Sequence, residues 1–279
     1  MPGTKRAIEP LYFGDHLSLR EFERRWTAMP ELKKAELIDG MVYVAHDMPV
    51  LPDFKLPFEN GDHLTLSQFM RLYEGVPELK KAELIEGMVF MAPLGMDHGE
   101  ADVAIAGLLY NYCAHTPGCE AGSNVTWKMS GAAPQPDSHL RIIEECGGQS
   151  RVEGKHKYGL GAPELLVEVC HSSVAYDLRQ KKSLYFNSGV IEYVTIQLHD
   201  RKIQWFVRSE SEFASMEPTK PGVFRSRVFP GFWLNSRALF ANQKLQLFKT
   251  LNAGIESAEH AAFVKTLAAM KKKPKGRTK

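Results

Sequence analysis

Two acidic residues in the C-terminal half of the chain have the types and spacing needed for metal-assisted chemistry. Asp137 follows Pro136 near the start of an expected strand, and Glu168 comes 31 residues later (168 − 137), inside the apolar run Leu165–Val169. A carboxylate in such a run is costly to bury unless it is paired, protonated or bound to a cation. Carboxylates from neighbouring strands form the oxygen cluster that Mg²⁺ or Mn²⁺ prefers. We therefore predict that Asp137 and Glu168 are ligands of such an ion.

Lys181 would complete this site from the helix expected over Asp177–Asn187, which follows the strand of Glu168. Its ammonium group could orient an attacking water or offset negative charge on a phosphate. Two other interpretations stay open. Glu168 and Lys181 could form a structural ion pair without catalysis. Alternatively, Lys181 could be a solvated helix lysine, with its neighbour Lys182 taking the catalytic role.

Two further residues are candidates for the same site. His98 precedes a helix expected over Gly99–Ala114, near an N-terminus where anions gather, so it could contact phosphate or transfer a proton. A helix-capping or surface histidine is the alternative. Glu83 could add another carboxylate, but its counterpart Glu36 occurs in an upstream repeat that lacks the rest of the site, so a structural role is equally open.

These residues depend on strands and helices that alternate along the chain. The helix over Gly99–Ala114 carries Val103, Ile105, Leu108, Leu109 and Tyr112 at helical spacing, which predicts that they share its buried side. A polar, glycine-rich loop is expected later, near Cys146–Gly161. The apolar run Glu164–Cys170 is typical of a strand covered on both faces. Further strands are expected at 125–127, 189–194, 203–207 and 223–228, and further helices from Ser236 and over 258–270. This order predicts an α/β fold with a mixed sheet flanked by helices.

The N-terminal part contains a repeat. Gly14–Ala45 and Gly61–Ala92 align without a gap at an offset of 47 (61 − 14), with 20 of 32 positions identical. Each copy predicts a helix and then a β-hairpin around an Asp-Gly or Glu-Gly turn. We interpret the copies as a tandem duplication of one helix–hairpin unit. We expect a first unit over 1–46, a proline-containing linker over 47–60, a main domain over 61–242 and a helical, basic extension over 243–279.

Composition is that of a globular protein, with 44% hydrophobic and 24% charged residues and a net charge of +2. The segment Lys271–Lys279 carries six basic residues and no acid, which indicates a solvated end or a contributor to nonspecific phosphate affinity. Four cysteines without paired spacing argue against a zinc site and a disulfide framework. No secretion signal or membrane span is evident, so we expect a cytoplasmic protein.

The ordered motifs between about Gly61 and Phe240 resemble a known family. They read ELIEGMVFMAP, DHGE, QPD, GAPELLVEVCHSS, YDLRQKKSLYFNSGVIEYV and FPGFWL. This order is similar to that of the Uma2 family of restriction endonucleases, which has a PD-(D/E)XK nuclease core. The resemblance implies a restriction-endonuclease-like fold for the main domain.

The resemblance also implies roles for individual residues. Asp137 corresponds to the acid of the Pro-Asp motif and Glu168 to the second acid. Cys170 stands where other nucleases have their lysine, whereas this family carries a lysine four residues before a tyrosine on the next helix. Counting back from Tyr185 gives Lys181. The histidine after the hairpin corresponds to His98.

Together these observations predict an endonuclease that hydrolyses DNA phosphodiester bonds with Mg²⁺ or Mn²⁺. Asp137 and Glu168 would be the metal ligands, with the carbonyl of Val169 as a third, and Lys181 and His98 would complete the catalytic set. DNA and a second copy of the chain, in a homodimer, are the expected partners. The alternative is a catalytically inactive module that keeps the nuclease fold for binding or assembly.

Overall fold

The computed structural model describes two compact units of the chain. The described residues are 8, 11, 15, 17–29, 35–38, 41–44, 58–75, 81–91, 95–153, 157–170, 177–219 and 222–271. The first unit spans Met1–Phe58 and Gly75–Lys80, and the second spans Glu59–Glu74 and Lys81–Lys279. Each unit has its own hydrophobic contacts, and they are described separately.

The first unit is a helix followed by a hairpin. Its elements are α1 (Leu19–Thr27), β1 (Ala35–Ile38) and β2 (Met41–Val44), and the two strands pair antiparallel. Ser18 caps α1 by accepting a hydrogen bond from the backbone N–H of Glu21 at 3.3 Å. Phe22 of the helix packs with Val42 of the hairpin in a small apolar cluster. The predicted helix and hairpin of the first copy are therefore present.

The second unit begins with the same local structure. Its elements are α2 (Leu66–Glu74), β3 (Glu83–Ile85) and β4 (Met88–Phe90). Helix α2 starts 47 residues after α1 (66 − 19) and is also nine residues long. The N–H of Val42 donates to the carbonyl of Asp15 at 2.8 Å, and the N–H of Val89 donates to the carbonyl of Asp62 at 2.8 Å. The sequence repeat is thus also a repeat of backbone hydrogen bonding.

A six-stranded mixed sheet forms the centre of the second unit. Its strand order is β13-β12-β11-β10-β7-β5. The strands are β5 (Cys119–Ser123), β7 (Ser138–Ile142), β10 (Leu165–Cys170), β11 (Glu192–Gln197), β12 (Lys202–Arg208) and β13 (Phe213–Met216). Only β10 and β11 pair in parallel within this sheet, and its other neighbours are antiparallel. The mixed sheet predicted from the sequence is confirmed.

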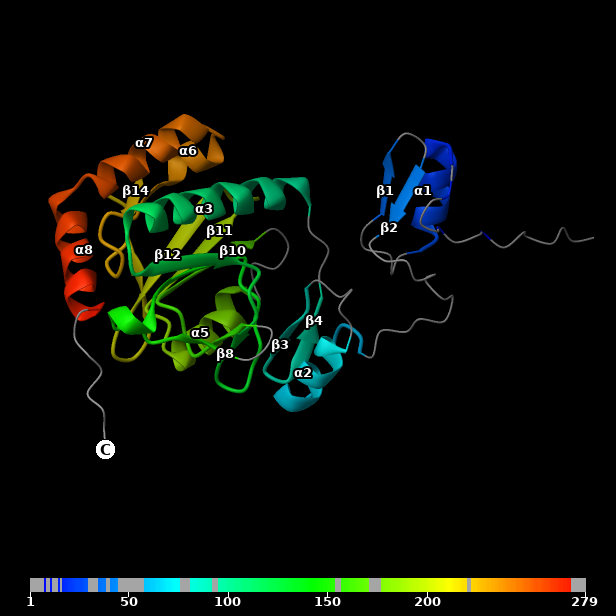
Figure 1. Cartoon of the computed structure of the whole chain (residues 1–279), viewed down its shortest axis with the longest axis horizontal. Helices are drawn as coiled ribbons and strands as arrows, with labels where there is room; N and C mark the ends of the chain where they lie inside the picture. Colours follow the sequence, from blue (N-terminus) through cyan, green and yellow to red (C-terminus); the bar gives the residue numbers. More distant parts are fainter. Residues whose placement is uncertain are drawn as a thin grey trace, which may run out of the picture. The chain divides into compact units, whose positions relative to one another are not determined.

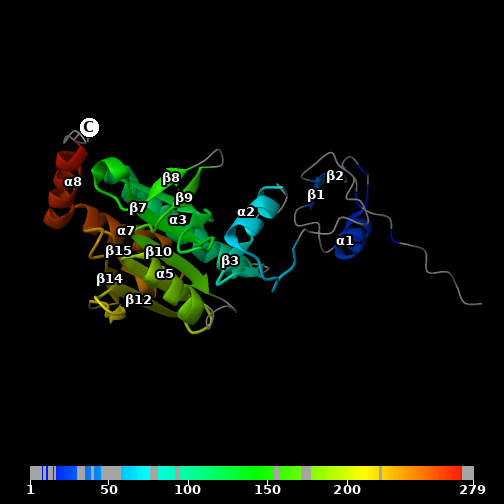
Figure 2. The same cartoon turned by 90° about the horizontal axis from the view of Figure 1, so that it is seen from below.

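Helices lie on both faces of this sheet, with α3 (Met96–His115) on one face and α5 (Lys182–Ser188) on the other (Figures 1 and 2). The π-helical turn η2 (Asp177–Lys181) leads into α5, and the last described helices are α6 (Ser236–Phe240), α7 (Lys244–Ile255) and α8 (Ala258–Lys271), of which α7 contacts α3. Val167 of β10 belongs to the apolar core with α3 and α7, whereas Leu166 packs with Leu184 and Tyr185 of α5. All six residues of β10 are buried, which explains why its sequence is apolar without alternation.

Parts of the second unit differ from the prediction. The expected loop at 146–161 instead contains η1 (Glu144–Cys146), β8 (Arg151–Glu153) and β9 (Tyr158–Leu160). Strand β9 pairs with β8 and with β6 (Trp127–Lys128). Such strands are too short to show a hydrophobic period, so the sequence reads as a loop. A last hairpin pairs β14 (Val223–Arg225) with β15 (Trp233–Asn235).

Two features of the helices also differ from the prediction. Val103, which was expected on the buried side of α3, is 73% exposed, because the core lies on the side of Ile105, Leu108 and Tyr112. Helix α7 was not anticipated, although Leu247 and Leu251 bury it against the core. None of the helices in the described part of the chain is long and apolar enough to cross a membrane.

Candidate active site

The ends of β7 and β10 bring the two predicted acids together. These strands pair antiparallel with Val167 opposite Ser138, so Glu168 and Asp137 are the next residues along the two chains. The backbone N–H of Val169 also donates a hydrogen bond to Oδ2 of Asp137 at 2.8 Å. Asp137 and the strand of Glu168 are thus in contact, and that the two carboxylates form one metal-binding pair stays a prediction.

Glu168 is buried on the face of the sheet that α5 covers. Its Oε1 atom accepts hydrogen bonds from the Lys181 ammonium at 3.0 Å and from the Tyr185 hydroxyl at 2.6 Å. Burial raises the pKa of Glu168, and the charge of Lys181 opposes this rise. Nearby Asp137, Asp177 and Glu83 add to it, so the pKa of Glu168 lies above its usual range. A cation close to Glu168 would favour its ionised form.

Lys181 lies at the centre of the acidic residues. Its ammonium nitrogen is 3.0 Å from Oε1 of Glu168, 3.0 Å from Oε1 of Glu83 and 3.6 Å from Oδ1 of Asp177. Both Asp177 and Lys181 belong to the π-helical turn η2, a kind of distortion that is frequent at functional sites. The surface-lysine interpretation is wrong for Lys181, whose side chain is 4% exposed. Lys182 instead places its ammonium 3.8 Å from the centre of the Phe206 ring.

Asp137 has two cationic or hydrogen-bonding neighbours of its own. Its Oδ1 atom is 2.7 Å from the Lys81 ammonium, and its Oδ2 atom is 3.2 Å from Nε2 of His98. Burial acts to raise the pKa of Asp137, but the hydrogen bond from His98 and the charge of Lys81 outweigh it. They hold the pKa of Asp137 well below its usual range. Asp137 is therefore an anion throughout the physiological pH range.

His98 is neither a surface residue nor the cap of α3. It is 5% exposed, and Gly95 is the N-cap residue of the helix. Because a carboxylate only accepts hydrogen bonds, Nε2 of His98 carries the proton that it shares with Asp137. Its other ring nitrogen, Nδ1, is buried and has no hydrogen-bond partner in the described part of the chain. The structure thus places His98 against one of the two acids.

Comparison with known proteins identifies the family. A family described as "Uma2: Putative restriction endonuclease" matches residues 66–237, which are 172 of 279 residues (237 − 66 + 1). The chain belongs to the Uma2 family. Among solved structures, it is similar to a "putative nuclease belonging to DUF820" from Anabaena variabilis ATCC 29413. That match has 16% identity and a TM-score of 0.50, and covers 64% of this chain and 98% of the other. No curated protein matches this chain.

The solved structure agrees with the fold of the Uma2 protein. Similarity at this identity shows the architecture alone, a mixed sheet flanked by helices. The family match begins within the second copy of the helix–hairpin, at the start of α2, and ends in α6. It therefore includes Lys81, Asp137, Glu168 and Lys181.

Lys81 is the principal site residue that sequence reasoning missed. It precedes β3, and its ammonium reaches Asp137 across 56 residues of sequence. Burial lowers the pKa of Lys81, but the charges of Asp137, Glu83 and Glu168 raise it by more, so the lysine is cationic. The available signal was the identical lysine at position 34 of the first copy, but identity between copies fits a structural role equally well.

The hairpin and α3 each add a carboxylate near the two central acids. Glu83 of β3 accepts a hydrogen bond from the backbone N–H of Gln135 at 2.7 Å, in addition to its contact with Lys181. Asp102 of α3 accepts a hydrogen bond from the Ser138 hydroxyl at 3.4 Å. Burial and the neighbouring charge of Asp137 raise the pKa of Asp102.

Acidic side chains outnumber lysines at the site. Within the described residues, two lysine ammonium groups, those of Lys81 and Lys181, contact a group of five acids, Glu83, Asp102, Asp137, Glu168 and Asp177. Among the described residues, no three His, Cys, Asp or Glu side chains are placed to hold a metal ion by themselves. Mg²⁺ characteristically takes one or two carboxylates and completes its shell with water and substrate phosphate. Asp137 and Glu168 match that requirement.

Proposed function

We propose that this Uma2 protein is a metal-dependent endonuclease that hydrolyses phosphodiester bonds of DNA. The observation that carries the proposal is the pair of buried carboxylates, Asp137 and Glu168, at adjoining ends of β7 and β10. Their surplus of negative charge favours binding of Mg²⁺ or Mn²⁺. The family description supports nuclease chemistry.

Asp137 and Glu168 would hold the ion, with the carbonyl of Val169 as a third ligand. When bound, the ion polarises a phosphate oxygen and lowers the pKa of a bound water. Glu168 has one oxygen available for this role. Its Oε1 atom accepts from Lys181 and Tyr185, whereas Oε2 has no ion pair or hydrogen bond within the residues that the structure describes.

Lys181 would orient the attacking water or offset charge that develops on the phosphate. Glu83 and Asp177 also contact its ammonium group, so the position of Lys181 does not depend on Glu168 alone. Tyr185 donates to Glu168 from the same helix and fixes the carboxylate. These contacts make Lys181 part of a preorganised arrangement.

His98 and Lys81 would act on Asp137. The hydrogen bond from His98 fixes the orientation of the carboxylate, and we propose that His98 also moves a proton during the reaction. Lys81 occupies Oδ1 of Asp137 and must give way if that oxygen is to contact an ion. Lys81 is the more exposed of the two partners, with its side chain 24% exposed and that of His98 6% exposed.

One observation favours the second candidate, a nuclease-fold module without catalysis. Both central acids already have cationic or hydrogen-bonding partners within the protein, and Asp137 and Glu168 are 2% and 3% exposed. A closed network of this kind is also compatible with a structural role. The homodimer expected from the sequence stays a prediction that light scattering in solution would test.

Cleavage assays separate the two candidates. Plasmid and single-stranded DNA are incubated with the full chain in Mg²⁺ or Mn²⁺, alongside Asp137→Ala and a control, Asp200→Ala, in which an exposed turn carboxylate is removed. The nuclease proposal expects cleavage by wild type and control and its loss in Asp137→Ala. Cleavage by none of the proteins, or equal cleavage by all three, would sink the proposal in favour of the inactive module.

A further inference from the structure

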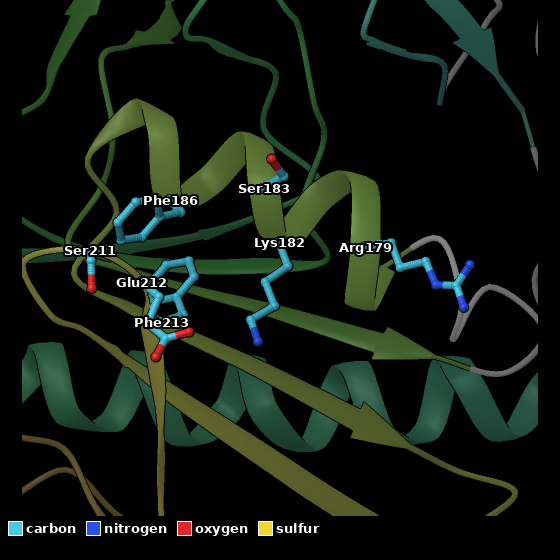
Figure 3. A pocket seen from close by; sticks show the side chains of 7 residues that line it. All are labelled: Arg179, Lys182, Ser183, Phe186, Ser211, Glu212 and Phe213. Carbon is cyan, nitrogen blue, oxygen red and sulfur yellow. The ribbon is translucent and has the colours of Figure 1, made fainter.

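The helix that carries Lys181 presents a second face to a surface hollow. Arg179, Lys182, Ser183 and Phe186 follow one another at helical spacing along η2 and α5, and they line the hollow together with Ser211, Glu212 and Phe213. Its volume is about 240 Å³. Figure 3 shows Lys182 extending from the helix near Glu212 and Phe213, while Arg179 leaves the helix nearer its N-terminal end.

The cations of this hollow are not neutralised by ion pairs. Neither Arg179 nor Lys182 has an ion pair or side-chain hydrogen bond to any described residue. The ammonium of Lys182 lies over the Phe206 ring at 3.8 Å from its centre. Burial lowers the pKa of Lys182, and the charge of Glu212 acts in the opposite direction. A partly desolvated cation without a counterion gains more from a bound anion than a fully hydrated one does.

A third cation, Arg208, contacts one of the lining residues, Phe186. The guanidinium carbon of Arg208 lies 4.2 Å from the centre of the Phe186 ring, and Arg208 also donates to the carbonyl of Phe186. Glu212 is the single acid among the lining residues. The hollow therefore has a positive balance, in contrast to the acidic site on the other side of the same helix.

We propose that the hollow binds the phosphodiester backbone of the nucleic acid, next to the phosphate that is cut at Asp137 and Glu168. This inference rests on the proposed function. Lys181 lies between Arg179 and Lys182 in the chain, so one short helical segment would contact consecutive parts of a strand. Arg and Lys contacts to phosphates position a strand without reading its bases. The hollow would thus set the register of the strand relative to the acids.

Binding of a short fluorescent DNA tests this inference on the full chain. Anisotropy is measured for a single strand and its duplex in EDTA, over a series of salt concentrations. The test variant is Arg179→Gln/Lys182→Gln. The matched control is Lys244→Gln/Lys249→Gln, which removes the same charge from exposed positions on α7, on the other face of the sheet. Circular dichroism verifies that both variants are folded.

The expected result is a loss of affinity specific to the hollow. Loss of two phosphate contacts lowers the slope of log K against log salt by about 1.8 for duplex or about 1.4 for single strands. The control keeps a slope close to that of wild type. In a further variant, Glu212→Gln, affinity rises because the acid among the lining residues is gone. Equal slopes for the test and control variants, with no rise for Glu212→Gln, would overturn the inference.

Cleavage measured in parallel separates the failure of this inference from that of the proposed function. If wild type cleaves DNA but the hollow variants bind as the control does, the nuclease proposal stands and the hollow is not a backbone site. If wild type binds through the hollow without cleaving, the inference stands and the catalytic proposal fails. If wild type does not bind either DNA, both are wrong. A backbone site would also be contradicted if inorganic phosphate at millimolar concentration displaced the DNA while the affinity for DNA did not depend on salt concentration.

Discussion

Replacement of Glu168 by Gln should remove activity while making the fold less sensitive to pH. The structure allows this substitution without new strain, because the amide oxygen can accept from Lys181 and Tyr185 as Oε1 does now. The amide nitrogen then takes the place of Oε2. At pH values above the raised pKa of Glu168, the substitution therefore removes one negative charge from a site with a surplus of carboxylates, and at every pH it keeps the hydrogen bonds of Oε1.

The size of the effect follows from the raised pKa of Glu168. The folded chain binds a proton at Glu168 more readily than the unfolded chain does. Stability contributed by this group is therefore present below the unfolded pKa of Glu, near 4.5, and is lost as pH rises toward the folded pKa. Each pH unit between the two values costs about 1.4 kcal/mol of unfolding free energy. At pH values above both, Glu168→Gln should therefore be more stable than wild type by at least about 1 kcal/mol.

Urea unfolding at a series of pH values between mildly acidic and mildly alkaline measures this difference. Wild type should lose stability relative to Glu168→Gln as pH rises, because the other acids titrate equally in both proteins. Glu192→Gln is the matched contrast. Glu192 is a buried acid whose two oxygens each accept two hydrogen bonds, from Ser226, Trp205 and the N–H groups of Arg227 and Val228. An amide nitrogen would meet donors there, so Glu192→Gln should be destabilising.

The reasoning is refuted if Glu168→Gln is less stable than wild type at alkaline pH, or if the stability difference between the two proteins does not change with pH. Either result would mean that Lys181 neutralises Glu168 completely and that the site has no surplus charge to share with an ion.

Three further changes test other contacts of the site. Lys181→Met should lower the free energy of unfolding in urea by about 3–5 kcal/mol, because it leaves buried acids without their cation. Lys182→Met should lower it by about 1 kcal/mol, because only a ring contact is lost. Equal losses would contradict the placement of Lys181, rather than Lys182, in the site. Lys81→Met should tighten Mn²⁺ binding, measured by electron paramagnetic resonance or calorimetry, because it frees Oδ1 of Asp137; weaker binding would show that Lys81 supports the ion site. His98→Ala should slow cleavage severalfold while Glu100→Ala, at an exposed position in the same turn, leaves the rate unchanged; equal rates would remove His98 from the catalytic set.

The sequence was sufficient to predict those strands and helices whose apolar residues form long, regular patterns. Strand β10 is buried on both faces, and its unbroken apolar run predicted this directly. Helix α3 extends over 20 residues and was predicted from its spacing. The three-residue strands β8 and β9 gave no such signal, because a strand of that length can show at most one alternation. Val103 is exposed because the sheet covers the other side of α3. The spacing of apolar residues in the sequence does not by itself determine which side that is.

The candidate site was predictable in part for a similar reason. Glu168 was recognisable because a charge inside an apolar run needs an explanation, and in the structure the charge of Asp137 acts on it. The preference for Lys181 over Lys182 came from the family resemblance, since both lie on one expected helix. Lys81 could not be identified as a site residue from the sequence, because its contact with Asp137 joins segments 56 residues apart and depends on how the β3–β4 hairpin packs.

The hydrogen bonds of Glu168 differ from those of other buried acids in the second unit, in a way that a purely structural ion-pair network does not explain. The carboxylate of Glu164 accepts from the N–H groups of Ile142 and Gln149, and that of Glu192 is fully hydrogen-bonded. Each of these acids is satisfied by neutral donors, as expected for groups that only stabilise the fold. Glu168 instead has both of its contacts on one oxygen, and its pKa is raised by the charges of neighbouring carboxylates as well as by burial. Accumulated like charge of this kind costs stability unless a cation binds, so the arrangement supports the ion binding that we propose.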